Sequence, residues 1–382
     1  MLYIKQLRFI FIFLFAVLFS VFSVDAVSQD IGRPISAKGA VLISADTDNV
    51  IYEKNSDEKL SMASTTKIMT GLLALEKVQK DGDFLMGITE EMVMVEGSSM
   101  GLRAGDKLMM SDVVSGLMLA SGNDAANSLA IAIAGTQEAF AELMNAKAAE
   151  IGMVNTNFVT PSGLDDEVHY STAYDMAILT REAMKNEIFR EIVSSKTRSV
   201  NFINPEKTVR YSNHNKLLSL YESCIGVKTG FTEKSGRCLV SAAERNGVTL
   251  IAVTLNADDD WNDHIAMFDY GFSKIENISF NETDFFAKIN LVGSDSSIIK
   301  VSGIDGGEKS LLDIDTDEIE RVVYLPKFVY APVKNGDMIG VVKYYMNDSE
   351  FLSVPIIAQE TVEYKFIEEE SFWDKILNKF KN

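Results

Sequence analysis

Residues 60–76 read LSMASTTKIMTGLLALE, and they place Ser64 and Lys67 where a loop changes into the apolar pattern of a helix. Residues three apart share one face of a helix, so these two side chains are expected to lie side by side. The apolar residues that mark the buried face of this helix are Ile68, Met69, Leu72, Leu73 and Leu75. A lysine so close to a buried face is costly unless it has a partner or a task. Lys67 is therefore either an ordinary solvated charge or a group held against Ser64 for chemistry.

The S-x-x-K spacing alone is weak evidence, because the chain contains two further examples. One, at residues 56–59, lies in a polar turn. The other, at residues 297–300, lies in a strand-like run, where positions three apart point to opposite faces. Only Ser64 and Lys67 stand at the start of a helix, which makes them the candidate pair.

Two further short motifs give the pair its context. Residues 121–123 read S-G-N between two helical segments, and residues 228–230 read K-T-G in a strand-like run. S-x-N also occurs at residues 199–201 and 279–281, so it is not specific by itself. The informative signal is the ordered set of S-x-x-K at a helix start, S-x-N between helices and K-T-G on a strand.

Serine is a poor nucleophile unless a base lies beside it. No histidine of the chain has a recognisable triad context, so Lys67 is the candidate base. Burial and a nearby positive charge both lower the pKa of a lysine, and Lys228 would supply that charge. Negative charge that develops on Ser64 would be stabilised by the positive end of the helix dipole.

Composition excludes several classes of protein. The 382 residues are enough for two or three domains, and a hydrophobic fraction of 47% excludes a disordered chain. The formal net charge of −19 argues against nucleic acid as a partner, which needs a basic surface. The three histidines, at positions 169, 214 and 264, have no metal-ligand spacing, and the chain contains neither HExxH nor CxxC. We therefore predict no metal and no cofactor.

The N-terminus predicts export. Lys5 and Arg8 precede an apolar run over residues 9–24, and Val-Asp-Ala at residues 24–26 is a small-residue cleavage site. These three features are typical of a secretory signal, here residues 1–26. An uncleaved membrane anchor is the alternative, although the run is short for a span of roughly 20 residues.

The rest of the chain changes character near Phe280. Before it, residues 39–59 predict two strands and residues 225–255 predict three, with helices over residues 108–135, 140–152 and 173–186. From about 280 to 362, short β-rich runs predict a small all-β domain. Cys224 and Cys238 are expected as buried thiols rather than a disulfide, since the hairpin register would not place them opposite each other.

The C-terminal residues 368–382 predict an amphipathic helix. One stripe of it holds Phe372, Trp373, Ile376, Leu377 and Phe380. Lysines follow beside this stripe at positions 375, 379 and 381. The stripe either packs on the chain's own domain or lies in the plane of a membrane with its lysines near phosphates, and we favour the membrane.

The ordered set of motifs resembles that of the penicillin-recognising serine acyl-enzymes, and within them the low-molecular-mass D-alanyl-D-alanine carboxypeptidases of the S11 type. Residues 101–127, 160–177 and 226–247 agree with that subgroup. The resemblance implies an α/β (α+β) fold with a β-lactamase/transpeptidase-like catalytic domain, in which helices flank an antiparallel sheet, over residues 30–277. It implies a β-rich domain over residues 280–365 and a terminal anchor helix.

The resemblance also implies roles for residues of the three motifs. Ser64 would form an acyl-enzyme, with its backbone N–H and that of Phe231 as the oxyanion hole. Ser121 would relay a proton to the leaving D-alanine nitrogen, hydrogen-bonded to Lys67 and Lys228.

The remaining implied roles concern substrate binding. Asn123 would bind the amide carbonyl of the substrate, and Lys228 and Thr229 would hold its terminal carboxylate. Gly230 would let the substrate pair along the strand edge. His214 stands where the resemblance points to an arginine, and we take it as a residue at the rim of the carboxylate subsite.

The implied substrates are peptidoglycan stem peptides, with β-lactams as inhibitors, at the outer face of the cytoplasmic membrane. Three alternatives stay open. A β-lactamase of the same fold would need a base for deacylation, yet the nearest match to E-x-x-L-N, at residues 142–145, lacks that pattern. A transpeptidase would be expected to carry large additional domains. A catalytically silent wall-binding module would not need the intact motifs. Asp165 and His169 either border the cleft or are structural.

Overall fold

The computed structural model describes residues 31–365. The predicted signal peptide and the predicted C-terminal helix therefore lie outside the described residues. Of the described residues, 35–365 belong to one compact unit. Among residues 31–365, no helix has the length and apolar character that a membrane span requires.

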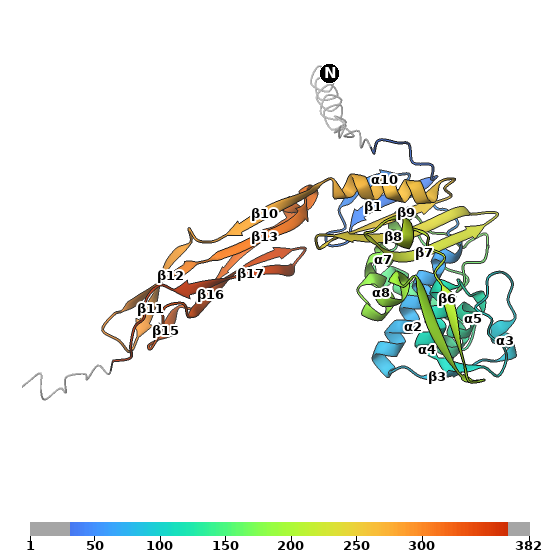
Figure 1. Cartoon of the computed structure of the whole chain (residues 1–382), viewed down its shortest axis with the longest axis horizontal. Coiled ribbons are helices and arrows are strands. Elements are labelled where there is room, and N and C mark those ends of the chain that lie inside the picture. Colours follow the sequence, from blue (N-terminus) through green and yellow to red (C-terminus); the bar gives the residue numbers. More distant parts are fainter. Residues whose placement is uncertain (1–30, 366–382) are drawn as a thin grey trace, which may run out of the picture. The chain divides into compact units, whose positions relative to one another are not determined.

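The first sheet has five antiparallel strands in the order β2-β1-β9-β8-β7 (Figure 1). Its strands are β1 (Gly39–Ser44), β2 (Val50–Lys54), β7 (Cys224–Thr232), β8 (Gly236–Arg245) and β9 (Val248–Leu255). The two strands predicted near the N-terminus and the three predicted over residues 225–255 are confirmed. Because β1 pairs with β9, distant parts of the chain close one sheet, with Leu42 opposite Ala252.

Helices cover both faces of this sheet. In Figure 1, α10 (Asp260–Phe272) lies along one face, and α7 (Ala173–Met184) and α8 (Glu187–Ser194) lie on the other. The predicted antiparallel sheet flanked by helices is therefore confirmed. α8 was not predicted, because EIFREIVS has only eight residues and three of them are charged.

Four further helices form a bundle beside the sheet. They are α2 (Lys67–Asp81), α4 (Met110–Leu119), α5 (Asn123–Ala134) and α6 (Gln137–Glu150). The break predicted at S-G-N is confirmed, since Ser121 has a φ of 57° between α4 and α5. The shorter helices are α3 (Glu90–Val93) and α9 (Leu217–Leu220).

A small antiparallel sheet beside the bundle was missed by the sequence analysis. It has the order β3-β4-β5-β6. Its strands are β3 (Leu85–Gly87), β4 (Lys107–Met109), β5 (Thr197–Asn204) and β6 (Lys207–Ser212). In β5 only Val200 and Phe202 are buried, so the apolar signal is weak.

The predicted β-rich region is confirmed as two packed sheets. A six-stranded sheet has the order β14-β16-β17-β12-β11-β15, and β10 pairs with β13 in a two-stranded sheet. The six strands are β11 (Phe286–Val292), β12 (Ile298–Gly303), β14 (Glu320–Tyr324), β15 (Phe328–Tyr330), β16 (Met338–Met346) and β17 (Ser349–Ala358). The two strands opposite are β10 (Ile275–Asn281) and β13 (Asp305–Leu312), so strand structure begins slightly before Phe280. The core between the sheets includes Phe280, Ile299, Val342, Val354 and Ile356.

The two cysteines are free and buried, as predicted. Cys224 lies opposite Ala243, and Cys238 lies opposite Gly230. The hairpin register therefore separates the thiols.

One buried carboxylate stabilises the β-rich region through its hydrogen bonds. Glu282 is 5% exposed and accepts hydrogen bonds from Arg321 Nε and Nη2, both at 2.6 Å. The Tyr344 hydroxyl donates to the same carboxylate. The guanidinium hydrogen bond is the main cause that lowers the pKa of Glu282. A bidentate pair of this kind compensates the cost of burying the charge.

Replacing Arg321 with Met should leave Glu282 buried without its cation. Because an uncompensated buried carboxylate is costly and Arg321 is partly exposed, we expect the opening free energy of this region to fall by about 2 kcal/mol. Hydrogen exchange of the β16 and β17 amides in the full chain measures it. The matched control is Lys343→Met, which breaks the more exposed pair with Glu350 and should cost less than about 1 kcal/mol. If the two variants lowered the opening free energy equally, the stabilising role assigned to the Glu282–Arg321 pair would be contradicted.

Candidate active site

Ser64 and Lys67 lie at the junction of a short 3-10 turn, Ala63–Thr66, and α2, whose first residue is Lys67. The α-helix thus begins three residues later than Ser64. The predicted contact is present, since Lys67 Nζ lies 2.8 Å from Ser64 Oγ. Lys67 is 0% exposed, so it is not an ordinary solvated charge.

The Lys67 amine has three oxygen partners. Besides Ser64, Nζ donates to Asn123 Oδ1 at 2.8 Å and to the Ser162 carbonyl at 2.6 Å. A neutral amine has two N–H groups and one lone pair. Asn123 and Ser162 can therefore accept the two N–H groups, which leaves the lone pair directed at the Ser64 hydroxyl.

Burial is the main cause that lowers the pKa of Lys67 well below its ordinary value. The positive charge of Lys228 lowers this pKa further, whereas the carboxylate of Asp124 opposes the shift. This agrees with the expectation that Lys228 favours a neutral Lys67.

The S-G-N segment brings both of its polar residues to the site, with one difference from expectation. The Asn123 amide is held at both ends, since Nδ2 also donates to the Glu96 carbonyl at 2.7 Å. Ser121 lines the same cleft as Ser64. The hydrogen bonds predicted from Ser121 to Lys67 and Lys228 are not formed. Lys67 Nζ contacts Ser64, Asn123 and Ser162 instead, and Lys228 Nζ donates to the Thr229 carbonyl.

The K-T-G strand lies against the nucleophile turn. A Cβ on Gly230 would stand 3.1 Å from the backbone nitrogens of Ser64 and Thr65 and from the Met62 carbonyl oxygen. Glycine therefore permits a backbone approach that a larger residue would push apart.

The positive charge of K-T-G is buried. Lys228 is 1% exposed, and its Nζ donates to the Thr229 carbonyl at 2.8 Å. Burial lowers the pKa of Lys228 to about 7. Lys228 is therefore poised to gain or lose its proton near neutral pH.

These elements open into a cleft of about 470 Å³. Its lining residues are Ser64, Ser98, Ser121, His214, Thr229, Gly230, Phe231, Arg237, Asp260 and Trp261. The cleft thus brings together the predicted residues from all three motifs, with Lys67, Asn123 and Lys228 buried beneath it. His214 stands in its wall, where burial and then the charge of Lys228 lower its pKa. Within residues 31–365, no group of three His, Cys, Asp or Glu side chains is arranged to hold a metal ion.

The loop over residues 159–169 positions Lys67 from the other side. His169 Nδ1 accepts from the Val159 N–H at 2.9 Å, so Nε2 carries the proton and donates to Thr66 Oγ1 at 2.9 Å. Gly163 has a φ of +81°, and a Cβ there would fall 1.9 Å from the Ala63 carbonyl oxygen. His169 is therefore structural, and Gly163 lets the loop reach Lys67.

Asp165 is not among the residues that line the cleft, and its carboxylate connects the loop to neighbouring segments. Its Oδ1 accepts from Thr232 Oγ1 at 2.9 Å, just beyond the K-T-G motif, and from Ser61 Oγ at 3.3 Å. The carboxylate thus links the loop to the strand and to the segment before the nucleophile.

Sequence reasoning missed several supports of the site. Ser162 contributes a backbone carbonyl, which no side-chain motif can reveal. Asp124 accepts from the backbone N–H groups of Met100, Gly101 and Leu102, and its place directly after S-G-N was a usable signal. Arg237, Asp260 and Trp261 reach the cleft from β8 and α10 and had no motif to mark them.

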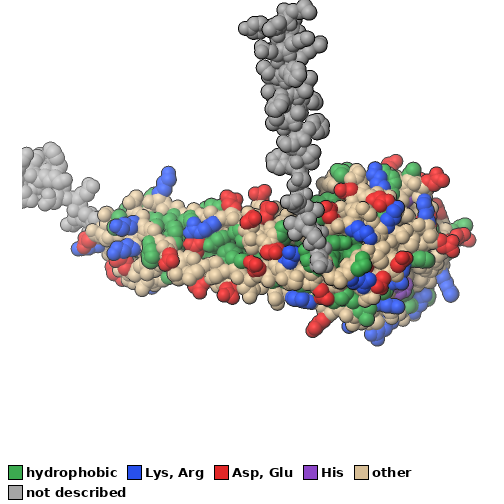
Figure 2. Space-filling view, turned by 90° about the horizontal axis from the view of Figure 1, so that it is seen from above, with side chains coloured by type: hydrophobic (Ala, Val, Ile, Leu, Met, Phe, Trp, Pro, Cys, Tyr) green, Lys and Arg blue, Asp and Glu red, His purple; other side chains and the backbone are tan. Residues whose placement is uncertain are grey.

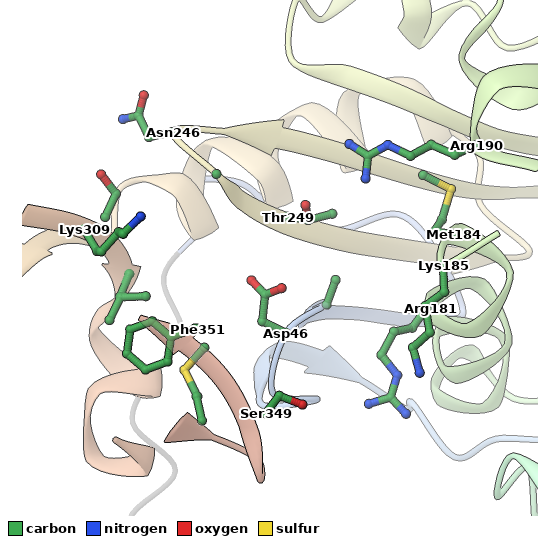
Figure 3. Close-up of a pocket in the computed structure, with 15 residues that line it drawn as sticks. Asp46, Arg181, Met184, Lys185, Arg190, Asn246, Thr249, Lys309, Ser349 and Phe351 are labelled. Carbon is green, nitrogen blue, oxygen red and sulfur yellow. The ribbon is translucent and has the colours of Figure 1, made fainter. Parts of the chain in front are cut away.

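A larger cavity of about 590 Å³ contains none of the motif residues (Figure 3). Asp46, Arg181, Arg190, Lys309 and Phe351 are among the residues that line it. Burial is the main cause that raises the pKa of Asp46 to about 6, followed by the nearby carboxylates. This cavity lacks a serine paired with a buried base, so the motif cleft is the candidate active site.

His169 should make folding sensitive to acid. Burial lowers its pKa to about 4 from 6.5, so the unfolded chain binds more protons between these pH values. Stability supplied by neutral His169 is present above pH 6.5 and is lost as pH falls towards 4, by about 1.4 kcal/mol per pH unit.

The variant His169→Asn keeps an acceptor for Val159 but cannot titrate. We expect the free energy of unfolding, measured with urea on the full chain, to differ less between pH 7 and pH 5 in this variant than in the parent. His214→Asn, a partly exposed histidine outside the loop, is the control and should change the difference less. An unchanged difference in His169→Asn would show that this histidine is not the acid-sensitive group.

Comparison with known proteins agrees with the geometry of the cleft. Residues 23–259 match the peptidase S11 family model, described as D-alanyl-D-alanine carboxypeptidase. Residues 315–364 match the model of the penicillin-binding protein 5 C-terminal domain. Among curated relatives, the D-alanyl-D-alanine carboxypeptidase DacF of Bacillus subtilis is 32% identical over 85% of this chain and 85% of its own length. DacC of Escherichia coli is 30% identical over 97% of this chain and 94% of its own length.

Solved structures show the same fold. Penicillin-binding protein 5 from Haemophilus influenzae matches with a TM-score of 0.61 at 26% identity, covering 87% of this chain and 98% of that one. The Streptomyces K15 DD-transpeptidase matches with a TM-score of 0.60 at 32% identity, covering 63% of this chain and 98% of that one. The chain therefore belongs to the peptidase S11 family and is a serine-type D-alanyl-D-alanine carboxypeptidase.

Proposed function

We propose that Ser64 is the nucleophile that opens the bond between the two terminal D-alanines of a peptidoglycan stem pentapeptide, with Lys67 as its general base. The observation that carries this proposal is the 2.8 Å contact between Ser64 Oγ and the Nζ of a fully buried lysine. An adjacent base is what a serine needs to become a nucleophile at neutral pH.

Acylation begins with transfer of the Ser64 hydroxyl proton to the neutral Lys67 amine. The Ser64 oxygen then bonds to the carbonyl carbon of the penultimate D-alanine, and the carbonyl oxygen becomes an oxyanion. Backbone N–H groups of Ser64 and Phe231 stabilise this charge. The close approach of Gly230 to the Ser64 nitrogen supports the pairing of these two donors at one position.

Collapse of the tetrahedral intermediate breaks the C–N bond. The leaving nitrogen needs a proton, which Ser121 relays from the protonated Lys67. The place of Ser121 in the same cleft as Ser64 supports this role, and substrate would bring the hydroxyl into hydrogen-bond reach of the amines. D-alanine leaves, and the stem peptide stays as an ester on Ser64 until water hydrolyses it.

Substrate binding uses the strand edge. Lys228 and Thr229 hold the terminal carboxylate, with His214 at the rim of that subsite. The Asn123 amide has one N–H left after its bond to Glu96, and this group meets the substrate amide carbonyl. A β-lactam that occupies this site acylates Ser64 in the same way.

The organisation of the chain is part of the proposal. Residues 1–26 are a signal peptide, residues 30–277 are the catalytic domain, and residues 280–365 are the β-rich domain. Residues 368–382 hold the exported protein on the outer face of the cytoplasmic membrane. The two family matches, over residues 23–259 and 315–364, support the two domains.

One alternative product deserves a measurement. The match to the Streptomyces K15 DD-transpeptidase spans 63% of this chain and 98% of the transpeptidase chain. That transpeptidase chain therefore carries no large additional domain. The expectation that a transpeptidase carries large additional domains therefore does not hold for this relative. If an amine such as D-amino-acid or glycine ester captured the acyl group faster than water did, the chain would act as a transpeptidase.

Ser64→Ala should abolish D-alanine release from a pentapeptide, because it removes the atom that forms the acyl bond. We expect a loss of at least about a thousandfold, as for other nucleophile removals. Intact-mass analysis with benzylpenicillin should find a covalent adduct on the parent and none on the variant. Ser297→Ala, which removes the serine of another S-x-x-K in an exposed position, is the matched control and should leave both readouts unchanged. D-alanine release at the parental rate by Ser64→Ala would refute the proposal, and rapid turnover of penicillin would identify a β-lactamase instead.

Removing the charge of Lys228 should raise the pKa of Lys67, because that charge is one cause that lowers it. In Lys228→Met the rate of penicillin acylation should therefore begin to fall at a higher pH than in the parent. Below that point the rate should fall about tenfold per pH unit, as one proton blocks the base. Stopped-flow rates from pH 4 to 9 test this, with Lys228→Arg as the control that keeps the charge. Identical acid limbs in Lys228→Met and the parent would contradict the coupling of the two lysines.

A further inference from the structure

The six-stranded sheet of the β-rich domain has one face without a protein partner in the described chain. Along β11, Ile289 and Leu291 are buried in the core, whereas Lys288, Asn290 and Val292 alternate with them and are exposed. Side chains of a strand point alternately to the two faces of its sheet. The exposed set therefore forms the opposite face, which we call the outer sheet face.

The outer sheet face is unusually apolar where β11, β12 and β15 lie together. Val292, Ile298, Phe328 and Tyr330 are 46%, 37%, 49% and 67% exposed. Val292 lies opposite Tyr330, and Asn290 lies opposite both Ile298 and Phe328, so the side chains are neighbours. The rings of Phe328 and Tyr330 meet edge to face, with centroids 5.4 Å apart. Exposed apolar clusters of this kind mark interaction surfaces. Figure 2 shows hydrophobic side chains exposed over the β-rich domain, with basic and acidic side chains among them.

The part of this face formed by β11, β12 and β15 is positively charged, opposite in sign to the chain, whereas Glu320 and Glu350 lie on its β14–β17 part. Lys288 lies directly opposite Lys300 on the neighbouring strand, and both are exposed. Like charges in this register destabilise a sheet. No residue of β11, β12 or β15 is acidic, although the chain as a whole carries a formal charge of −19. An anionic surface that lies over the two lysines would remove their repulsion.

The chain leaves the described structure beside this face. The Lys365 N–H donates to the Gly293 carbonyl at 2.8 Å, directly after Val292. The Ala331 N–H donates to the Val292 carbonyl at 2.9 Å, directly after Tyr330. Residues 366–382 follow at once, and they contain the aromatic residues Phe372, Trp373 and Phe380 with three lysines. The outer sheet face and this segment thus both contain aromatic residues and lysines, and the segment also contains Glu368, Glu369, Glu370 and Asp374.

We propose that the outer sheet face lies on an anionic lipid surface and that residues 366–382 are not the sole membrane contact of the chain. The aromatic and aliphatic side chains enter the interfacial region of the bilayer, and Lys288 and Lys300 meet lipid phosphates. This inference goes beyond the proposed catalytic function, since it uses none of the residues of the cleft. It also assigns the β-rich domain a role of its own.

A fluorescent label on Asn290→Cys tests the contact in the full mature chain. Asn290 is exposed at the centre of the face, and the native Cys224 and Cys238 are buried, so the new thiol is the preferred site of labelling. The label should be quenched by nitroxide-bearing lipid in equimolar phosphatidylglycerol and phosphatidylcholine vesicles. The matched control is Glu308→Cys on β13, in the opposite sheet, and its label should stay unquenched.

Removing the two charges tests the electrostatic part. Lys288→Gln combined with Lys300→Gln should weaken binding to the same vesicles by about tenfold and should leave binding to pure phosphatidylcholine unchanged. The double variant should unfold no more readily than the parent, because the like-charge pair is gone. Lys107→Gln combined with Lys309→Gln removes two exposed lysines elsewhere and should change vesicle binding little.

Two results would overturn the proposal. One is an unquenched Asn290 label on protein that sediments with the vesicles, which would show that residues 366–382 bind lipid alone. The other is that the chain self-associates without vesicles and that Phe328→Ser abolishes this self-association but leaves vesicle binding unchanged. That result would make the face a protein interface. D-alanine release is expected to stay at the parental level in every variant, so the two proposals fail independently.

Discussion

The burial of the Lys67 amine is the constraint on which the rest of the site depends. An amine taken out of water must have its hydrogen-bonding groups matched, or the fold loses stability. Three elements supply those matches: the 3-10 turn gives Ser64, α5 gives Asn123, and the loop after α6 gives the Ser162 carbonyl. The same arrangement that makes burial tolerable also lowers the pKa of the amine. Stability and basicity are therefore consequences of one geometry.

The surrounding fold can be understood as the scaffold for this contact. β1 and β9 close the sheet from distant parts of the chain, and β7 then runs beside the nucleophile turn. His169 and Asp165 fix the loop from two sides, one to Thr66 and one to Thr232. Glycine at position 163 permits a backbone approach that a Cβ would prevent, and glycine at position 230 permits one that a Cβ would force to widen slightly. The loop and α5 thus contact the Lys67 amine, and the strand lies against the turn that carries Ser64.

Much of this was predictable from sequence, for physical reasons that differ between elements. The helix after Lys67, the hairpins over residues 225–255 and the β-rich domain have strong apolar periodicity, and they were predicted correctly. The hairpin β5–β6 and the strand β13 are largely exposed and carry charge or glycine, so their patterns were too weak to detect. In the site, side-chain motifs pointed to Ser64, Lys67, Asn123 and Lys228. The Glu96 and Ser162 carbonyls were invisible, because any residue type has one. Hydrogen bonds from Ser121 were predicted by resemblance but are not formed.

The backbone contribution of Ser162 has a consequence for how such sites vary. An acceptor that belongs to the main chain is not lost when the side chain at that position changes. The residue type at position 162 is therefore restricted by packing, since Ser162 is buried, and not by the need for an acceptor. The shape of the loop is restricted by Gly163 and His169. The position of the Ser162 carbonyl thus depends on neighbouring residues of the loop rather than on the side chain of Ser162 itself.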